Sequence, residues 1–177
     1  PASHWAPLLT PYADGAAKKC PIKMVSYGGN CYKLFAYKVS WIEAEKSCQD
    51  YVPGAHLASI HSFVDLIETT NYILDYHNNF ENVWIGLYRI GKHSNSTPPE
   101  MMKWMWSDGS TSGYRYWDEG EPNNANSAMS CVELLHEAGY LYWNDEDCEV
   151  KHRFICKYKI NNFNAEFLKS AELDPED

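Results

Sequence analysis

The alternation of apolar and polar positions predicts two helices among several short strands. Residues 24–35 alternate around Gly28-Gly29-Asn30, which is typical of a hairpin turn between two strands. Ser40 and Glu43 have the spacing of a capping box, so Ser40 is expected to cap a first helix. Pro53-Gly54 should end that helix, because neither residue continues it well.

A second helix is expected to open at Ser62, with Asp65 three residues later. Apolar residues recur within it at helical spacing, and the expected inner stripe is Leu66, Ile67, Ile73 and Leu74. Residues 84–87 indicate a buried strand, and residues 141–143 and 152–157 indicate the closing strands. From residue 88 to residue 138 the chain is dominated by loop-forming residues. A loop region of that length is usually functional.

Composition narrows the function classes. The net charge is -9, and no run of Lys or Arg extends beyond Lys18-Lys19, which argues against nucleic-acid binding. The six Cys residues contain no C-x-x-C pair, so a disulfide framework is favoured over a zinc site. Six Cys allow fifteen pairings, and the sequence does not choose among them. Such a framework implies an oxidising, extracellular compartment. No stretch of about 18 apolar residues is present to insert into a membrane.

Two polar triplets carry the candidate chemistry. Glu121-Pro122-Asn123 is followed about twenty residues later by Trp143-Asn144-Asp145, around Cys131 and Cys148. Side-chain oxygens gathered in loops suit Ca²⁺, which takes six to eight oxygen ligands. A cis Glu121–Pro122 bond would aim both neighbouring side chains to one side, and we state this as a hypothesis. The alternative is that both triplets are ordinary surface turns.

A larger set of motifs follows one order along the chain. They are Cys31–Leu34, Ser40-Trp41, His56–Ile60, Trp84–Leu87, Trp104–Ser110, Tyr116-Trp117, Glu121–Asn123, Cys131–Glu133, Trp143–Asp145, Cys148 and Phe154–Cys156. Over about residues 20–158, this order resembles the C-type lectin-like domain. The resemblance implies an α+β fold with two helices, small antiparallel sheets and a long disulfide-closed loop region. Residues 1–19 are then an N-terminal extension. Residues 159–177 are an acidic tail or linker, in which residues 165–173 could form a short helix.

The resemblance also implies pairings and ligands. The disulfides would be Cys20–Cys31, Cys48–Cys156 and Cys131–Cys148. In sugar-binding members the two triplets contribute to one Ca²⁺ site, so the metal and carbohydrate ligands here would be Glu121, Asn123, Asn144 and Asp145. The Glu-Pro-Asn order marks mannose-, fucose- and N-acetylglucosamine-type glycans, whereas Gln-Pro-Asp would mark galactose.

The sequence departs from the family pattern in two places. Family members usually carry a further Glu ligand two residues before Cys131, and this chain has Met129, whose thioether suits Ca²⁺ poorly. Ser127, a loop carbonyl or water could substitute, whereas Glu133 is expected to be a structural residue. A second family calcium site would use the positions of Arg89 and Asn124. An Arg side chain is no cation ligand, so that site is expected to be absent.

The expected function is that of a secreted or cell-surface lectin that binds mannose-type glycans on cells, microbes or glycoproteins. Single domains of this kind bind weakly, so useful avidity requires an oligomer. The alternative is a calcium-independent protein-interaction module on the same fold. An enzyme is not expected, because the chain has neither H-E-x-x-H nor G-x-S-x-G. Asn95 begins a glycosylation sequon, and Trp104, Trp106, Trp117 and Trp143 are expected mainly in the core.

Overall fold

The structure is a computed structural model that describes residues 20, 24–76, 81–91, 103–123 and 129–160. The expected N-terminal extension, the Asn95 sequon, Asn124, Ser127 and the expected helix at residues 165–173 lie outside the described residues. The elements are β1 (Val25–Tyr27), β2 (Asn30–Val39), α1 (Trp41–Tyr51), β3 (His56–Leu57), α2 (Phe63–Tyr76), β4 (Val83–Ile90), β5 (Met105–Trp106), β6 (Met129–Leu134), β7 (Trp143–Asp147) and β8 (His152–Lys159).

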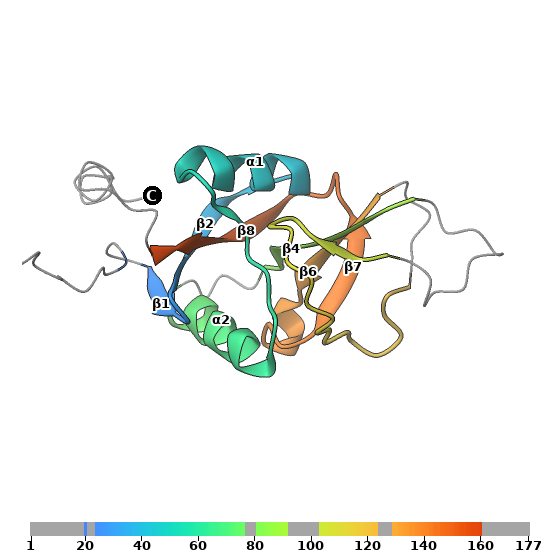
Figure 1. The fold of residues 1–177 in the computed structure, drawn as a ribbon. Helices are drawn as coiled ribbons and strands as arrows, with labels where there is room; N and C mark the ends of the chain where they lie inside the picture. The colour runs from blue at the N-terminus through green and yellow to red at the C-terminus, as the bar shows by residue number, and fades with distance from the viewer. Residues whose placement is uncertain (1–19, 21–23, 77–80, 92–102, 124–128, 161–177) are drawn as a thin grey trace, which may run out of the picture.

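The strands form one hydrogen-bonded network in the order β1-β2-β8-β4-β6-β7, with β3 on β8 and β5 on β4 (Figure 1). All pairs are antiparallel except β4 and β8. The expected α+β class is confirmed. The small antiparallel sheets anticipated from the sequence are joined by the parallel β4–β8 pair, which no local sequence signal specifies because the two strands are about seventy residues apart.

The two helices lie on opposite sides of this sheet (Figure 1). The core on one side includes Leu66 and Ile73 of α2 with Trp143 and Ile155 from the sheet. The core on the other side includes residues of α1, Trp84 and all the sulfur atoms of two disulfides. Both faces of the sheet are covered, so β7, which carries the Trp143–Asp145 triplet, is held in a packed framework.

The first helix begins as its sequence predicts. The Ser40 backbone N–H donates to Glu43 Oε2 at 3.0 Å, and the Glu43 N–H donates to Ser40 Oγ at 3.4 Å, which completes the capping box. In α2, Leu66 and Ile73 are buried and Ile67 is half-buried, but Leu74 is 42% exposed. The prediction for Leu74 was wrong. Tyr72 fills the inner face instead, and its hydroxyl accepts the Leu34 N–H at 3.2 Å.

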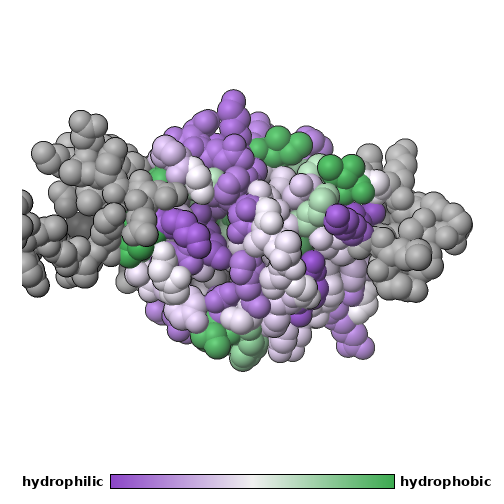
Figure 2. All heavy atoms as spheres, in the orientation of Figure 1, coloured by the Kyte–Doolittle hydropathy of each residue, from purple (hydrophilic) through white to green (hydrophobic). Residues whose placement is uncertain are grey.

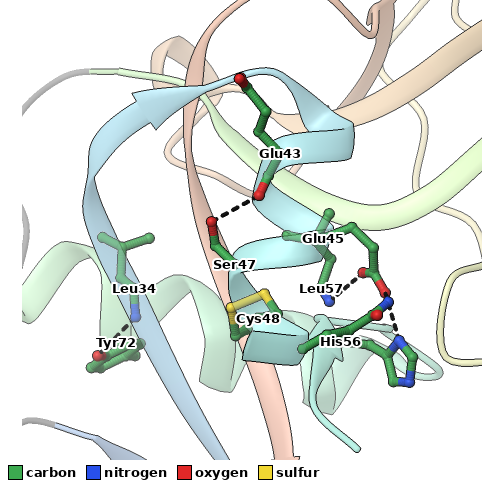
Figure 3. Close-up of a disulfide and its surroundings, with 10 residues drawn as sticks. Leu34, Glu43, Glu45, Ser47, Cys48, His56, Leu57 and Tyr72 are labelled. Atoms are coloured by element: carbon green, nitrogen blue, oxygen red, sulfur yellow. Dashed lines mark hydrogen bonds and ion pairs between the residues drawn. A yellow bond between two sulfur atoms is a disulfide. The ribbon is translucent and has the colours of Figure 1, made fainter. Parts of the chain in front are cut away.

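Three disulfides join Cys20 to Cys31, Cys48 to Cys156 and Cys131 to Cys148. These are the pairs that the resemblance implied. Cys48–Cys156 ties α1 to β8, beside the contacts that Glu45 makes to β3 (Figure 3). Cys131–Cys148 joins β6 to the residue that follows β7. The strand that carries Trp143–Asp145 is therefore linked covalently to its neighbour in the sheet.

The described surface is mostly hydrophilic, with small separate hydrophobic patches on the face shown in Figure 2. Of the four tryptophans expected in the core, Trp106 and Trp143 are buried and Trp104 and Trp117 are half-buried against the same cluster. Two hollows of about 380 and 280 Å³ share Asn82 and His136 in their lining. In the described part of the chain, no helix is long and apolar enough to cross a membrane.

Candidate functional site: a carboxylate and amide cluster beside β7

The segment before the first triplet is hydrogen-bonded to the strand that carries the second. The Trp143 N–H donates to the Tyr116 carbonyl at 3.0 Å, and the Asp118 N–H donates to the Trp143 carbonyl at 2.9 Å. The chain then turns, with Gly120 at a φ of +83° and the Glu121 N–H donating to the Asp118 carbonyl at 3.0 Å. A φ in this range favours glycine. The turn brings Glu121 back toward β7.

The turn places Asn123 between two carboxylates. The Glu121–Pro122 bond is cis, as hypothesised. The Asn123 backbone N–H donates to Glu121 Oε2 at 2.8 Å and to Asp145 Oδ1 at 3.0 Å. The Asn123 side-chain amide also donates to Glu121 Oε1 at 3.0 Å. Glu121, Asn123 and Asp145 therefore form one cluster, although Asp145 is 22 to 24 positions later in the sequence than the other two.

The charges in this cluster favour a cation. Asp145 is 3% exposed and Glu121 is half-buried. Partial burial raises the pKa of the Glu121 carboxyl, and the neighbouring Asp145 carboxyl raises it further, while the Asn123 donors act in the opposite direction. A proton is bound more tightly here because burial disfavours the charged carboxylate and because a second carboxylate lies beside it. A metal cation would relieve the same repulsion with its own positive charge.

Asn144 is the fourth predicted ligand, and its side chain contacts a residue outside this cluster. In the ladder between β6 and β7, Asn144 is directly opposite Glu133, and Val132 is opposite Asp145. The Asn144 side-chain nitrogen donates to Glu133 Oε1 at 2.9 Å. Successive strand residues point to opposite faces of a sheet, so Asn144 can reach the cluster beside Asp145 only around the edge of β7, which is the last strand in the sheet order. The structure thus joins Glu121, Asn123 and Asp145 by hydrogen bonds and ties Asn144 to Glu133.

Glu133 has contacts within the fold, as expected of a structural residue, but the sequence did not reveal its partners. It is 2% exposed, and its Oε2 lies 2.7 Å from His152 Nε2. Its place two residues after Cys131 was visible in the sequence, but the partner across the ladder was not. Only the register of β6 against β7 brings Glu133 to Asn144.

The two positions that depart from the family pattern have hydrophobic or structural partners. Met129 is half-buried, begins β6 opposite Ile90, and packs against the core cluster that contains Cys131 and Cys148. Arg89 is 2% exposed and donates to the Gly91 carbonyl at 2.6 Å and to Ser130 Oγ at 2.8 Å. The Met129 side chain is therefore used in packing, and the Arg89 guanidinium is used in hydrogen bonds within the fold.

The donor set has limits that bear on any metal. Among the residues that the structure describes, no group of three or more His, Cys, Asp or Glu side chains could by itself hold an ion. The cluster supplies two carboxylates, and its remaining oxygens come from amides and backbone. Such a set fits a hard cation like Ca²⁺, which accepts carbonyl oxygens and waters, better than a transition metal that requires His or Cys.

Comparison with known proteins identifies the family. C-type lectin BfL-2 of Bungarus fasciatus is 44% identical over 140 residues, which cover 79% of this chain and 84% of that protein. A C-type lectin mannose-binding isoform of Notechis scutatus scutatus is 41% identical over 141 residues, covering 80% of this chain and 84% of the relative.

Solved structures agree with this likeness. Human lithostathine is 30% identical with a TM-score of 0.69, over 81% of this chain and 93% of its own. The carbohydrate-recognition domain of cow CD23, solved in the presence of a GlcNAc2Man3 oligosaccharide, is 27% identical with a TM-score of 0.62, over 80% and 96%. A calcium-independent type II antifreeze protein is 31% identical with a TM-score of 0.58, over 80% and 95%. The Lectin C-type domain family matches residues 37–158, and the chain belongs to that family.

Proposed function

We propose that this protein is a calcium-dependent lectin that recognises mannose-, fucose- or N-acetylglucosamine-type glycans. The proposed ligands of a single Ca²⁺ are Glu121, Asn123, Asn144 and Asp145. The observation that carries the proposal is the Asn123 backbone N–H, which donates to the carboxylates of both Glu121 and Asp145. Two carboxylates from different segments, held by one donor, are an arrangement that a cation stabilises.

Each residue has a role that follows from its chemistry. Bound calcium would supply a Lewis-acidic contact for two neighbouring sugar hydroxyls. Glu121 can accept a hydrogen bond from a hydroxyl, and the amide nitrogen of Asn123 can donate one. The Glu-Pro-Asn order therefore offers a hydrogen-bond acceptor before Pro122 and a hydrogen-bond donor after it. Asn123 is exposed and Glu121 is half-buried, so we expect the proposed site to be shallow.

A shallow site implies weak binding. A monosaccharide is expected to bind with a Kd on the order of 1 mM, or about 4 kcal/mol. Recognition of cells, microbes or glycoproteins would then use several domains together, which can multiply affinity. Three disulfides in one small domain support a secreted or cell-surface location. The names of the relatives support a binding protein rather than an enzyme.

Retention on immobilised mannose tests this proposal. We expect the protein to be retained in calcium and released by a chelator, and Glu121→Gln with Asn123→Asp to shift retention toward galactose. Glu119→Gln removes an exposed carboxylate two residues away, and it should leave retention unchanged. Retention that survives chelation would contradict the proposal.

One observation favours a second function. Met129 packs against the core where sugar-binding members usually carry a carboxylate. The calcium-independent antifreeze protein among the structural neighbours has the same fold. Loss of that ligand would leave a calcium-independent interaction module, and this alternative predicts no response to calcium in any binding assay.

A further inference from the structure

Glu133 is a buried carboxylate in the middle of a core strand. Its side chain is 2% exposed, and its strand neighbours Val132 and Leu134 are fully buried. Burying a carboxylate is costly unless it is paired and hydrogen-bonded. An acidic side chain at this depth therefore needs a structural partner or a functional reason.

Each oxygen of Glu133 has one close polar neighbour. Oε1 accepts the Asn144 amide at 2.9 Å, and Oε2 lies 2.7 Å from His152 Nε2. The His152 ring meets Trp84 edge-on, with the ring centroids 4.6 Å apart. Trp84 is itself fully buried and lies opposite Glu133 in the ladder between β4 and β6. The Glu133 carboxylate is thus fixed from the side opposite Asn144.

This arrangement determines which end of the Asn144 amide faces Glu133. The NH₂ group of Asn144 is the end that donates to Glu133 Oε1. The carbonyl oxygen of Asn144 is then directed away from Glu133. A free amide could turn either end toward a cation, but only the oxygen is a ligand for Ca²⁺.

We propose that Glu133, held by His152, is a positioning residue that orients the Asn144 carbonyl oxygen for the calcium site. This inference rests on the proposed function and adds to it a carboxylate outside the ligand set. Outer partners that orient ligands contribute strongly to metal affinity, because a ligand held in the binding orientation loses less entropy when the ion arrives.

The chain also contains a control pair. Glu45 Oε1 lies 2.6 Å from His56 Nδ1, and Glu45 Oε2 accepts the Leu57 N–H at 2.9 Å (Figure 3). This pair also joins a carboxylate to a histidine and links two elements, α1 and β3. The second oxygen of Glu45 accepts a backbone N–H, so we expect this pair to stabilise the fold without orienting a ligand. Removing Glu45 should cost stability without affecting the calcium site.

The test is calcium affinity, measured by calorimetry up to tens of millimolar, with melting temperature recorded beside it. We expect Glu133→Leu to weaken calcium binding by about 10–100-fold, the range seen when outer partners of metal ligands are removed. Glu133→Gln keeps an oxygen that can accept from Asn144, so it should retain intermediate affinity. Glu45→Leu should lower the melting temperature and leave calcium affinity within about twofold of the wild type.

An additional comparison separates positioning from a general loss of structure. If Glu133 acts through Asn144, Glu133→Leu should have little further effect on calcium affinity in an Asn144→Ala background. Wild-type affinity in both folded Glu133 variants would overturn the inference while leaving the proposed function intact. If Glu133→Leu does not fold, the Glu133→Gln titration decides alone. A wild type that binds no calcium would overturn the inference and the proposed function together.

Discussion

Glu121→Gln should raise the stability of the calcium-free protein and remove its response to calcium. The Glu121 and Asp145 carboxylates accept from the same Asn123 N–H, so each oxygen lies within 3.0 Å of one nitrogen. The two oxygens are therefore at most about 6 Å apart, a separation at which two unit charges repel by about 3 kcal/mol at an effective dielectric constant of about 20 and by less than about 1 kcal/mol in water. Glu121 is half-buried, so we expect about 1 kcal/mol.

This repulsion predicts a measurable change in melting temperature. In a domain of this size, 1 kcal/mol corresponds to about 2–4 °C, so the calcium-free variant should melt higher than the wild type by that amount at pH 7. A neutral amide oxygen can still accept the Asn123 N–H, so the hydrogen bond is retained. Calcium at about 100 times its Kd should stabilise the wild type by about 2.7 kcal/mol and leave the variant unchanged.

The pH dependence follows from the raised pKa of Glu121. The folded calcium-free protein binds this proton more tightly than the unfolded chain does, so its stability rises as the pH falls toward that pKa. The difference between wild type and Glu121→Gln should therefore shrink below neutral pH. Scanning calorimetry in chelator at several pH values measures both quantities, with Glu119→Gln as the control. A calcium-free variant that is less stable than the wild type at pH 7 would refute the reasoning.

Two further predictions concern the framework of the site. Gly86→Ala should destabilise the fold by about 1–3 kcal/mol, because an added Cβ would lie 2.6 Å from the Leu57 carbonyl oxygen, and denaturant unfolding measures the loss. Replacing Cys131 and Cys148 together by Ser should cost about 3 kcal/mol, because the 17-residue separation sets the entropy of the opened loop. The same replacement of Cys48 and Cys156, which are 108 residues apart, should cost about 5 kcal/mol, and an equal loss for both pairs would contradict the loop-entropy argument.

Local signals in the sequence predicted local structure well. Ser40 and Glu43 satisfy each other within one helical turn, so their spacing was sufficient to place the start of α1. Gly28 and Gly29 both adopt positive φ, which the hairpin requires. Leu74 was misplaced because helical spacing gives the direction of a stripe but not its width, and the sheet contacts only the narrower face that contains Leu66 and Ile73.

The candidate site was predicted in part, because its composition is local and its assembly is not. Glu121 and Asn123 are neighbours in sequence, and their side-chain hydrogen bond needs only the turn between them. The bond from Asn123 to Asp145 depends on how the Tyr116 segment pairs with β7. The partnership of Glu133 with Asn144 depends on strand register, which is set by the whole sheet. The family resemblance grouped the residues of the two triplets in one site, but the contact between Glu133 and Asn144 could not be predicted from the sequence.

A calorimetric titration of chelator-stripped protein with calcium tests the central claim most directly. The account predicts one saturable site at micromolar to low-millimolar concentration in the wild type, with no measurable site in Asp145→Asn. It also predicts a higher melting temperature for the wild type in calcium. No heat and no change in melting temperature up to several millimolar calcium would contradict the account, and the calcium-independent interaction module would then be the better description.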